Sequence, residues 1–485
     1  MSINYLAVAR TISASGALTG VAMILVTPVS LCFREYSEAG GLALCAAASL
    51  LVAGAFALFA RVPNAAPAPE LKPRDAMLTV CVWWLTSSVL GGLPYIICGV
   101  AGAADAVFES VSGFTTTGLT VLDRLSDLPQ SIVLWRAATG WMGGLEISAF
   151  LTAALGATMR AETLPGRAER TPARKRAAAA RFCAAYAGVT LLLVLLLAAA
   201  RTKPFDALIV ALGTVSTCGF SGAGGLEEIT SAAKGILSAF MLLAAVNFMF
   251  FRRFQTRRAD TRAQDEELRR FLFIFCAATV LIGLDLLSTS SVARAPQNFG
   301  NAFFETASAI STTGFHGAGV YSWPSFCKIS LLCLMITGGC AVSATGGLKV
   351  SRIVILLRLL QRNISVRLHP NAVLPVKFDG RAVPADTASA IAAHGMLYIA
   401  VFAAATLIVS ADGAGGESAA SVFGVLACMS NAGPGMAVLH PELASAAWAV
   451  YGAPVKLFFG FLMILGRLEF TSMLVLFTPR YWKND

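Results

Sequence analysis

The sequence predicts an all-α, polytopic membrane protein in which one unit recurs four times around a central pore. Of the 485 residues, 56% are hydrophobic and only 13% are charged, a charged share far below that of soluble domains. Apolar runs of about 20 residues, the length that spans a bilayer, occur throughout the chain. Four short Gly-centred stretches recur at near-regular intervals between these runs. Together these observations predict four quasi-equivalent loops carried by membrane helices.

Composition also narrows the class of function. The net charge of +10 fits the excess of Lys and Arg that membrane proteins carry in cytoplasmic loops, so no nucleic-acid partner is predicted. The eleven Cys are scattered without a C-x-x-C pair, a pattern that indicates neither a zinc site nor a disulfide framework. The four His are dispersed, and no H-E-x-x-H, P-loop or G-x-S-x-G motif occurs, which argues against a membrane enzyme.

Ten membrane spans are predicted in the lipid bilayer. They cover residues 18–33, 41–60, 77–100, 131–158, 182–200, 236–251, 271–287, 329–360 (interrupted), 391–409 and 448–477. The first exceeds the core of a cleavable signal peptide and is expected to remain as a span. Basic residues concentrate in the loops at 160–181, 252–270 and 349–381, all on the side of the N-terminus. By the positive-inside rule both termini are cytoplasmic.

The four Gly-centred stretches lie on the opposite, extracytoplasmic side. They read FESVSGFTTTGL at 108–119, ALGTVSTCGF at 211–220, FETASAISTTGF at 304–315 and VLACMSNAGPG at 425–435. The first and third are near copies, with identities at Ala106/Ala302, Phe108/Phe304, Glu109/Glu305, Ser112/Ser308, Thr116/Thr312, Thr117/Thr313 and Gly118/Gly314. The fourth is the most divergent, because Asn431 and Ala432 stand at the Thr positions.

The predicted repeat is a span, a short helix, a Gly loop and a second span, an internal repetition common among membrane transporters. Two extra spans at 1–75 precede it. The four repeats are assigned to 76–175, 176–265, 266–370 and 371–485, with loops at 114–119, 215–220, 311–315 and 430–435.

A ring of such loops suits a cation pore. Non-helical backbone at membrane depth is tolerated only where protein buries it or where it meets water and ions. Gly permits a positive φ and lets carbonyls approach an axis, while the stiff Thr adds a hydroxyl that coordinates an ion or braces a neighbour. Neutral oxygen ligands without a carboxylate ring favour a monovalent ion.

Three further features bear on transport. Residues 337–347, TGGCAVSATGG, interrupt an apolar span with four Gly. This stretch is predicted to form either a flexible gate below the third loop or a kink that allows close helix packing. Arg467 lies in the last apolar span, where an ionisable group costs about 2.5–3.5 kcal/mol; it either faces the pore or pairs with Glu469. Glu109 and Glu305, in the predicted pore helices, either hold filter N–H groups or make the vestibule negative.

These residues resemble the Trk/Ktr/HKT superfamily of K+ transporters, and within it the TrkH-type subunits of bacterial Trk uptake systems. The resemblance covers nearly the whole chain, and the two extra N-terminal spans fit the TrkH-type arrangement. It is carried by DAVFESVSGFTTTGLTVLD, TGGCAVSATGGLKVSR, SNAGPGM and LGRLEFTSMLVLFTPRYW. It implies gated, channel-like K+ uptake across the bacterial cytoplasmic (inner) membrane.

The resemblance also implies roles for particular residues. K+, as the transported ion, would meet a filter lined by Thr116, Thr117, Gly118, Thr217, Cys218, Gly219, Thr312, Thr313, Gly314, Asn431, Ala432 and Gly433. A gating loop would include Gly338, Gly339, Gly346 and Gly347, and Arg467 would face the pore. The protein would be a homodimer gated by a cytosolic nucleotide-binding (NAD-, ATP- or ADP-binding, RCK-like) regulatory subunit docked on the basic loops.

Cys218 departs from the family pattern, because relatives often have Gly there, and its side chain needs space behind the filter. With one Gly in each loop, we expect moderate discrimination between K+ and Na+. The alternatives are a Na+-permeable transporter or an H+- or Na+-coupled symporter. A non-conducting membrane scaffold or sensor, or a membrane enzyme, would be a different class of protein.

Overall fold

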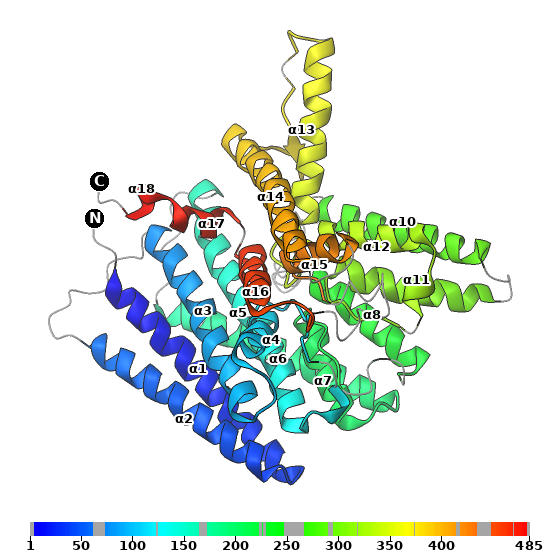
Figure 1. Cartoon of the computed structure of the whole chain (residues 1–485). Helices are drawn as coiled ribbons and strands as arrows, with labels where there is room; N and C mark the ends of the chain where they lie inside the picture. The colour runs from blue at the N-terminus through cyan, green and yellow to red at the C-terminus, as the bar shows by residue number, and fades with distance from the viewer. Residues whose placement is uncertain are drawn as a thin grey trace.

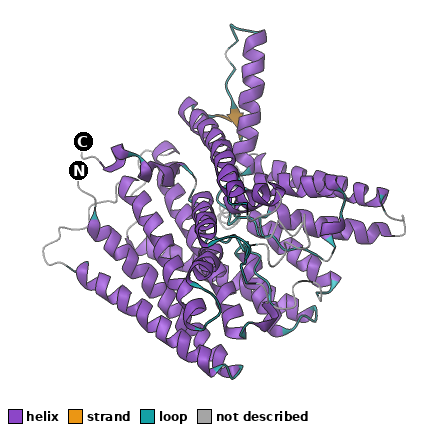
Figure 2. Cartoon of the chain, viewed as in Figure 1, coloured by secondary structure: helices purple, strands orange, loops and turns teal. Residues whose placement is uncertain are grey.

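The computed structural model shows a helical protein with four short helices at its centre. It describes residues 4–61, 73–122, 125–163, 172–222, 226, 229–246, 266–289, 294–317, 319–372, 374–413, 418–433, 448–468 and 470–482. Within these residues the only strands are β1 (Lys377–Phe378) and β2 (Arg381–Ala382), which pair antiparallel. Figure 2 shows this small hairpin at the side of a projecting helix, with loop segments gathered at the centre of the helices.

The helices follow the predicted order. They are α1 (Tyr5–Cys32), α2 (Tyr36–Phe59), α3 (Pro73–Ile97), α4 (Ala103–Phe114), α5 (Gln130–Thr163), α6 (Pro172–Ala199), α7 (Pro204–Val215), α8 (Ser231–Ala245), α10 (Glu266–Ser288), α11 (Ala295–Ile310), α12 (Ser325–Thr337), α13 (Val350–Leu368), α14 (Ala385–Ala411), α15 (Ser418–Ser430), α16 (Ala453–Arg467), α17 (Thr471–Leu474) and α18 (Pro479–Trp482). Short 3-10 turns occupy Leu125–Asp127, Val320–Ser322 and Val475–Phe477. Figure 1 shows α13 projecting beyond the other helices.

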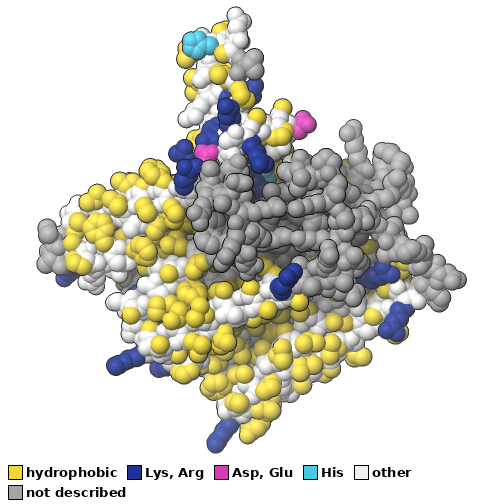
Figure 3. Space-filling model, turned by 180° about the vertical axis from the view of Figure 1, so that it is seen from behind, with side chains coloured by type: hydrophobic (Ala, Val, Ile, Leu, Met, Phe, Trp, Pro, Cys, Tyr) yellow, Lys and Arg dark blue, Asp and Glu magenta, His cyan; other side chains and the backbone are white. Residues whose placement is uncertain are grey.

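Six of the described helices are long and apolar enough to cross a membrane: α1, α2, α3, α6, α10 and α14. Their outer faces carry exposed side chains such as Leu25, Leu51, Leu191 and Leu407. Figure 3 shows such hydrophobic side chains spread over the broad body, with Lys and Arg gathered near the base of the projecting segment. This distribution is that of a multi-pass membrane protein, whose apolar surface faces lipid.

The structure confirms one predicted interruption and adds a second that the sequence did not predict. The interrupted span at 329–360 is confirmed, because α12 ends at Thr337 and α13 begins at Val350. The last span, predicted as continuous over 448–477, is instead broken after Arg467, where α16 ends. The apolar pattern runs through this break because Leu474 and Leu476 pack on the same core as α16, so hydropathy alone gives no sign of the helix end.

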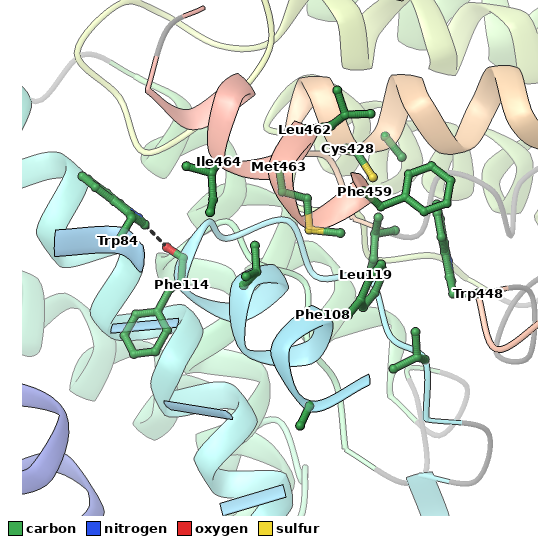
Figure 4. Close-up of a cluster of buried hydrophobic side chains, with 14 of the residues drawn as sticks. Trp84, Phe108, Phe114, Leu119, Cys428, Trp448, Phe459, Leu462, Met463 and Ile464 are labelled. Atoms are coloured by element: carbon green, nitrogen blue, oxygen red, sulfur yellow. Dashed lines mark hydrogen bonds between the residues drawn. The ribbon is translucent and has the colours of Figure 1, made fainter. Parts of the chain in front are cut away.

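A cluster of large side chains fixes the first short helix, α4 (Figure 4). The ring of Phe108 lies 5.9 Å from that of Trp448, which packs edge-on against Phe459 of α16 at 4.9 Å. On the other side, Trp84 of α3 donates its indole N–H to the carbonyl of Phe114 at 3.3 Å. The carbonyl end of α4 is therefore held between α3 and α16, which sets the position of the loop that follows it.

The N-terminal helices α1 and α2 are tied to α5 by a single carboxylate. Glu35, between α1 and α2, accepts hydrogen bonds from Gln130 N at 2.6 Å, from Ser131 N at 3.1 Å and from the Ser131 hydroxyl at 2.6 Å. These N–H groups belong to the first turn of α5, where the helix offers unpaired donors and a partial positive charge. Glu35 is therefore a helix cap supplied by a different part of the chain.

Replacing Glu35 with Ala should destabilise the protein by about 1–2 kcal/mol, the cost of losing a helix cap. The measurement is the midpoint of thermal unfolding in detergent, which we expect to fall in E35A. Glu38 lies on the same helix pair without a hydrogen bond to a described residue, so E38A is the matched control. Equal midpoints for E35A and E38A would show that the contact adds nothing.

Candidate functional site

Each short helix at the centre ends in a loop that carries three consecutive predicted filter residues. We call each set of three a triplet: residues 116–118, 217–219, 312–314 and 431–433. Helices α4, α7, α11 and α15 run into loop 1 (115–118), loop 2 (216–219), loop 3 (311–314) and loop 4 (431–433). All twelve predicted filter residues fall in these loops, and all are buried. The Pro-Gly at 434–435 that completes the predicted fourth loop lies outside the described residues.

The four helices end in the same way. The second residue of each triplet donates its N–H to a carbonyl in the last turn of the helix: Thr117 to Ser112 at 2.8 Å, Cys218 to Gly213 at 2.9 Å, Thr313 to Ser308 at 3.0 Å and Ala432 to Ala427 at 3.1 Å. This bond belongs to the Schellman motif. In that motif the residue directly before the N–H donor has a left-handed backbone and is usually Gly. The same local motif therefore ends all four helices.

The left-handed position does not hold Gly in any of the four loops. It is occupied by Thr116 (φ 52°), Thr217 (φ 58°), Thr312 (φ 53°) and Asn431 (φ 45°). A β-branched residue at positive φ is rare, and such strain costs about 1–3 kcal/mol. Asn tolerates this region better because its short amide side chain bonds locally. Strain repeated at equivalent points indicates a functional constraint on these loops.

The third residue of each triplet brings the loops into contact. Gly118, Gly219 and Gly314 have φ values of 76°, 73° and 80°. A Cβ on Gly118 would overlap the carbonyl of Cys218, one on Gly219 that of Thr313, and one on Gly314 the backbone of Gly433. Gly433, which does not take a positive φ, has its Cβ position 2.8 Å from Thr313 O and 3.4 Å from Thr117 O. Each loop therefore meets the next, and loop 4 returns to loop 1.

Side-chain hydroxyls brace the loops. Thr115 and Thr117 share a hydrogen bond of 2.7 Å, and Ser311 and Thr313 repeat it at 2.7 Å in loop 3. Asn431 donates its amide to Thr117 at 3.0 Å and so joins loops 4 and 1. The hydroxyls are thus held by neighbouring side chains, which fixes the direction of the adjoining backbone.

Cys218 fits because α5 makes room for it. Its Sγ would lie 2.7 Å from a Cβ at Gly140, and it approaches the carbonyl of Gly113 at 4.0 Å. The side chain points away from the loops into this space, so its backbone carbonyl keeps the same relation to Gly118 as Thr313 has to Gly219. The space that the sequence required behind loop 2 is therefore supplied by a Gly on a neighbouring helix.

Two buried carboxylates hold the chain as it leaves loops 1 and 3. Glu109 accepts from Val121 N at 3.2 Å and from the Thr120 hydroxyl at 3.0 Å. Glu305 accepts from Gly317 N at 2.6 Å and contacts Nδ1 of His316 at 3.0 Å. The expectation that these Glu residues hold N–H groups of the filter itself is wrong, because Val121 and Gly317 lie beyond the predicted filter residues.

Arg136 completes the carboxylate site behind loop 1 and was missed by the sequence reasoning. Its Nε lies 2.6 Å from Glu109, both side chains are almost fully buried, and its guanidinium stacks 4.3 Å from the ring of Phe220. The available signal was an Arg within the apolar run at 131–158, since an ionisable group in a span requires a partner. Because Arg136 neutralises Glu109, this carboxylate does not make the loop surroundings negative.

The predicted gate lies against the loops. We call residues 338–349, between α12 and α13, the interrupting segment. Gly346 N donates to the Thr312 hydroxyl at 2.9 Å, and the Thr217 hydroxyl donates to Ala344 O at 3.1 Å. Gly347 N donates to Ser430 O, next to loop 4, at 3.0 Å. The segment therefore contacts three of the four loop regions through atoms of its own backbone.

The glycines of the interrupting segment close its two ends on each other. Gly338, at the first end of the segment, and Gly347, near its second end, have φ values of 67° and 74°. A Cβ on Gly338 would overlap the carbonyl of Gly346, and a Cβ on Gly347 would overlap the backbone of Gly338. Gly339 faces the carbonyl of Ala245 at the end of α8, and Gly346 faces Ser430 O. Gly is thus required for close approach at all four positions, whereas a simple kink would need only one.

Arg467 reaches the same segment. Its Nη1 donates to Ala344 O at 2.7 Å, and its Nε and Nη2 have no hydrogen-bond partner among the described residues. It borders a cavity of about 40 Å³ that is also lined by Asn431, Thr345 and Lys349. Glu469, its predicted partner, lies outside the described residues. Arg467 therefore binds the interrupting segment and lines a cavity that Asn431 of loop 4 also lines.

A family sequence model, curated relatives and a solved structure all match this chain to the same family of proteins. The sequence model of the family TrkH, described as cation transport protein, matches residues 47–175 and 178–484. The Trk system potassium uptake protein TrkH of Salmonella typhimurium is 31% identical, over 99% of this chain and all of that protein. The TrkH of Halomonas elongata is 34% identical, over 87% and 89% of the two chains. The crystal structure of the potassium transporter TrkH from Vibrio parahaemolyticus superposes with a TM-score of 0.89 at 29% identity, over 99% of this chain and 100% of that one.

Replacing Arg136 with Met should destabilise the protein by about 3–5 kcal/mol, because Glu109 would remain buried without its cation. The double variant E109Q/R136M should recover a large part of this loss, since no buried charge remains. Thermal unfolding midpoints in detergent measure both, with R381M, at an exposed Arg of the hairpin, as control. A double variant no more stable than R136M would contradict the charge-pair explanation.

Proposed function

The chain belongs to the TrkH family of cation transport proteins, and from this premise we propose that it takes up K+ across the cytoplasmic membrane through its four loops. The observation that carries the proposal is the closed succession of contacts in which each loop Gly meets the backbone of the next loop. The relatives of known name are potassium uptake proteins and a potassium transporter. The family is one of ion transporters rather than enzymes.

In this proposal the loop carbonyls replace the hydration shell of K+. The backbone oxygens of Thr117, Cys218 and Thr313 already lie at the loop contacts, and neutral carbonyls suit a monovalent cation. Selection of K+ over Na+ requires the oxygens to resist closing around the smaller ion. The shared hydroxyl bonds and the buried Glu109 and Glu305 supply this resistance, because they hold the backbone on both sides of each Thr-Gly pair.

The fourth loop sets a limit on selectivity. Asn431 takes the left-handed position but Gly433 does not take the positive φ of the other three Gly residues. The ring therefore has three loops of one backbone conformation and one of another. With a single Gly in each loop, this inequality supports moderate rather than strict discrimination between K+ and Na+.

The interrupting segment is the proposed gate. It lies against loops 2 and 3 and next to loop 4, and Arg467 adds a buried positive charge at Ala344. A cation leaving the loops on that side would meet both a backbone obstruction and a repulsive charge. Conduction then requires the segment to move away and Arg467 to lose its contact with Ala344, which makes the transporter channel-like and gated.

The proposal extends to topology and assembly. Both termini and α13 would be cytoplasmic, because α13 and the surrounding loops are rich in Arg and Lys. The protein would form a homodimer and bind a cytosolic, nucleotide-binding regulatory subunit through these basic loops. The Trk system names of the relatives support a transporter that works with other subunits.

Expression of this chain should restore growth of a bacterium that lacks its own K+ uptake systems when K+ in the medium is low. Uptake of labelled Rb+ or K+ by the same cells gives the direct measurement, and a Na+ uptake assay identifies a Na+-permeable transporter. Absence of rescue, with the protein present in the membrane, would contradict K+ uptake.

Replacing Gly314 with Ser should crowd loops 3 and 4 and lower the ratio of K+ to Na+ uptake by severalfold. The reason is that a Cβ at this position meets the backbone of Gly433 and also strains a positive φ. G319S is the matched control, because Gly319 has a similar φ of 84° with only one distant neighbour, Ser322, at 3.9 Å. Unchanged discrimination in G314S would remove loop 3 from the filter.

A further inference from the structure

The first turn of α10 carries two adjacent carboxylates, and each binds a different part of the chain between α12 and α14. Glu267 contacts the interrupting segment, and Glu266 contacts α13 and the β1–β2 hairpin, which together we call the arm. The sequence reasoning assigned no role to either residue. Figure 1 shows the arm rising from the helix bundle with α10 beside its base.

Glu267 joins the interrupting segment to the start of α13. Its Oε1 accepts a hydrogen bond from Ala341 N, in the segment, at 2.6 Å. Ser351, in the first turn of α13, also interacts with this carboxylate. The start of α13 also pairs directly with the segment, since Val350 N donates to Gly339 O at 3.1 Å. The segment and the start of α13 are thus fastened to α10 at one point.

Glu266 fastens the arm. Arg358 of α13 binds both oxygens of Glu266, one through Nη1 at 3.1 Å, and also donates to the carbonyl of Lys377 in the hairpin. Asp379 at the hairpin turn donates its N–H to Glu266 at 3.1 Å and accepts from Glu266 N at 2.8 Å. A two-pronged Arg–carboxylate pair with backbone bonds on both sides fixes geometry better than a single surface ion pair.

We propose that Glu266 and Glu267 form a latch that couples the arm to the interrupting segment. With the Glu266–Arg358 contact in place, α13 is held against α10 and the segment stays under the loops. Release of Arg358 frees α13, and Ser351 and Val350 carry that displacement to Glu267 and Gly339. Glu266 and Glu267 are positioning residues, since neither contacts the loops. An effect of the latch on transport rests on the proposed gate. The latch contacts themselves can be tested by hydrogen exchange, which does not require the protein to conduct ions.

The test compares R358Q and E266Q with R362Q in purified protein. Arg362 is exposed on α13, one turn from Arg358, without a bond to a described residue, so R362Q removes the same charge from the arm but leaves the latch. Hydrogen exchange of residues 338–349 should be severalfold faster in R358Q and E266Q than in R362Q and the unchanged protein. Exchange equal to that of R362Q would overturn the latch.

Flux provides the second measurement. In proteoliposomes without any regulatory subunit, R358Q and E266Q should raise K+ influx severalfold with an unchanged K+ to Na+ ratio. The charge-reversed pair E266R/R358E restores the ion pair but not the bonds to Asp379 N and Lys377 O. It should therefore return exchange and influx part of the way toward the original values, a rescue that general destabilisation does not give. Faster exchange with unchanged influx would support the latch and contradict the gate, and failure of the reversed pair to rescue exchange would contradict the direct contact.

Discussion

The structure depends on backbone meeting backbone at the loop glycines. At Gly118, Gly219 and Gly314 no side chain fits, since the neighbouring loop occupies the place of the Cβ. Four chain segments can approach so closely only if each leaves its helix with the same sharp change of direction. The left-handed residues Thr116, Thr217, Thr312 and Asn431 provide that change. The strain they carry is compensated by the packing of α4, α7, α11 and α15 between the longer helices.

Burial of polar groups divides the four repeats into two kinds. Behind loops 1 and 3 a carboxylate holds the outgoing chain, while Val210 and Gly424 stand at the corresponding places of the other two repeats. Repeats 1 and 4 are further joined by Lys456 and Asp105 at 2.6 Å, whereas Asn301 replaces Asp105 in repeat 3. The four loops therefore share a similar turn of the backbone but differ in the side chains that hold them. Loops 1 and 3 tolerate less change in the chain that follows them, because that chain must keep its hydrogen bonds to a buried carboxylate.

The sequence predicted the helices, the four loops and the interruption of the eighth span, because each leaves a local mark: a long apolar run, a Gly after Thr, or Gly within a helix. It did not predict that Thr116 and its equivalents are left-handed, since Thr disfavours that conformation and only tertiary contacts impose it. The end of α16 at Arg467 was missed because apolar residues continue beyond it. Arg136 and Glu267 were missed for a related reason: their partners are distant in sequence, and pairing between distant residues has no local pattern.

The residues that shape the loops are also those that touch the interrupting segment. Thr217 and Thr312 each use the hydroxyl at the left-handed position to bond the segment, at Ala344 and Gly346. Gly at these positions would have been less strained but would offer no hydroxyl, so the choice of Thr links loop geometry to the segment. Moving the segment leaves two buried hydroxyls without partners, a loss that water or an ion must make good. Water carried by a cation at the proposed filter can accept from the Thr217 hydroxyl and donate to the Thr312 hydroxyl. Occupancy of the proposed filter would therefore favour withdrawal of the proposed gate.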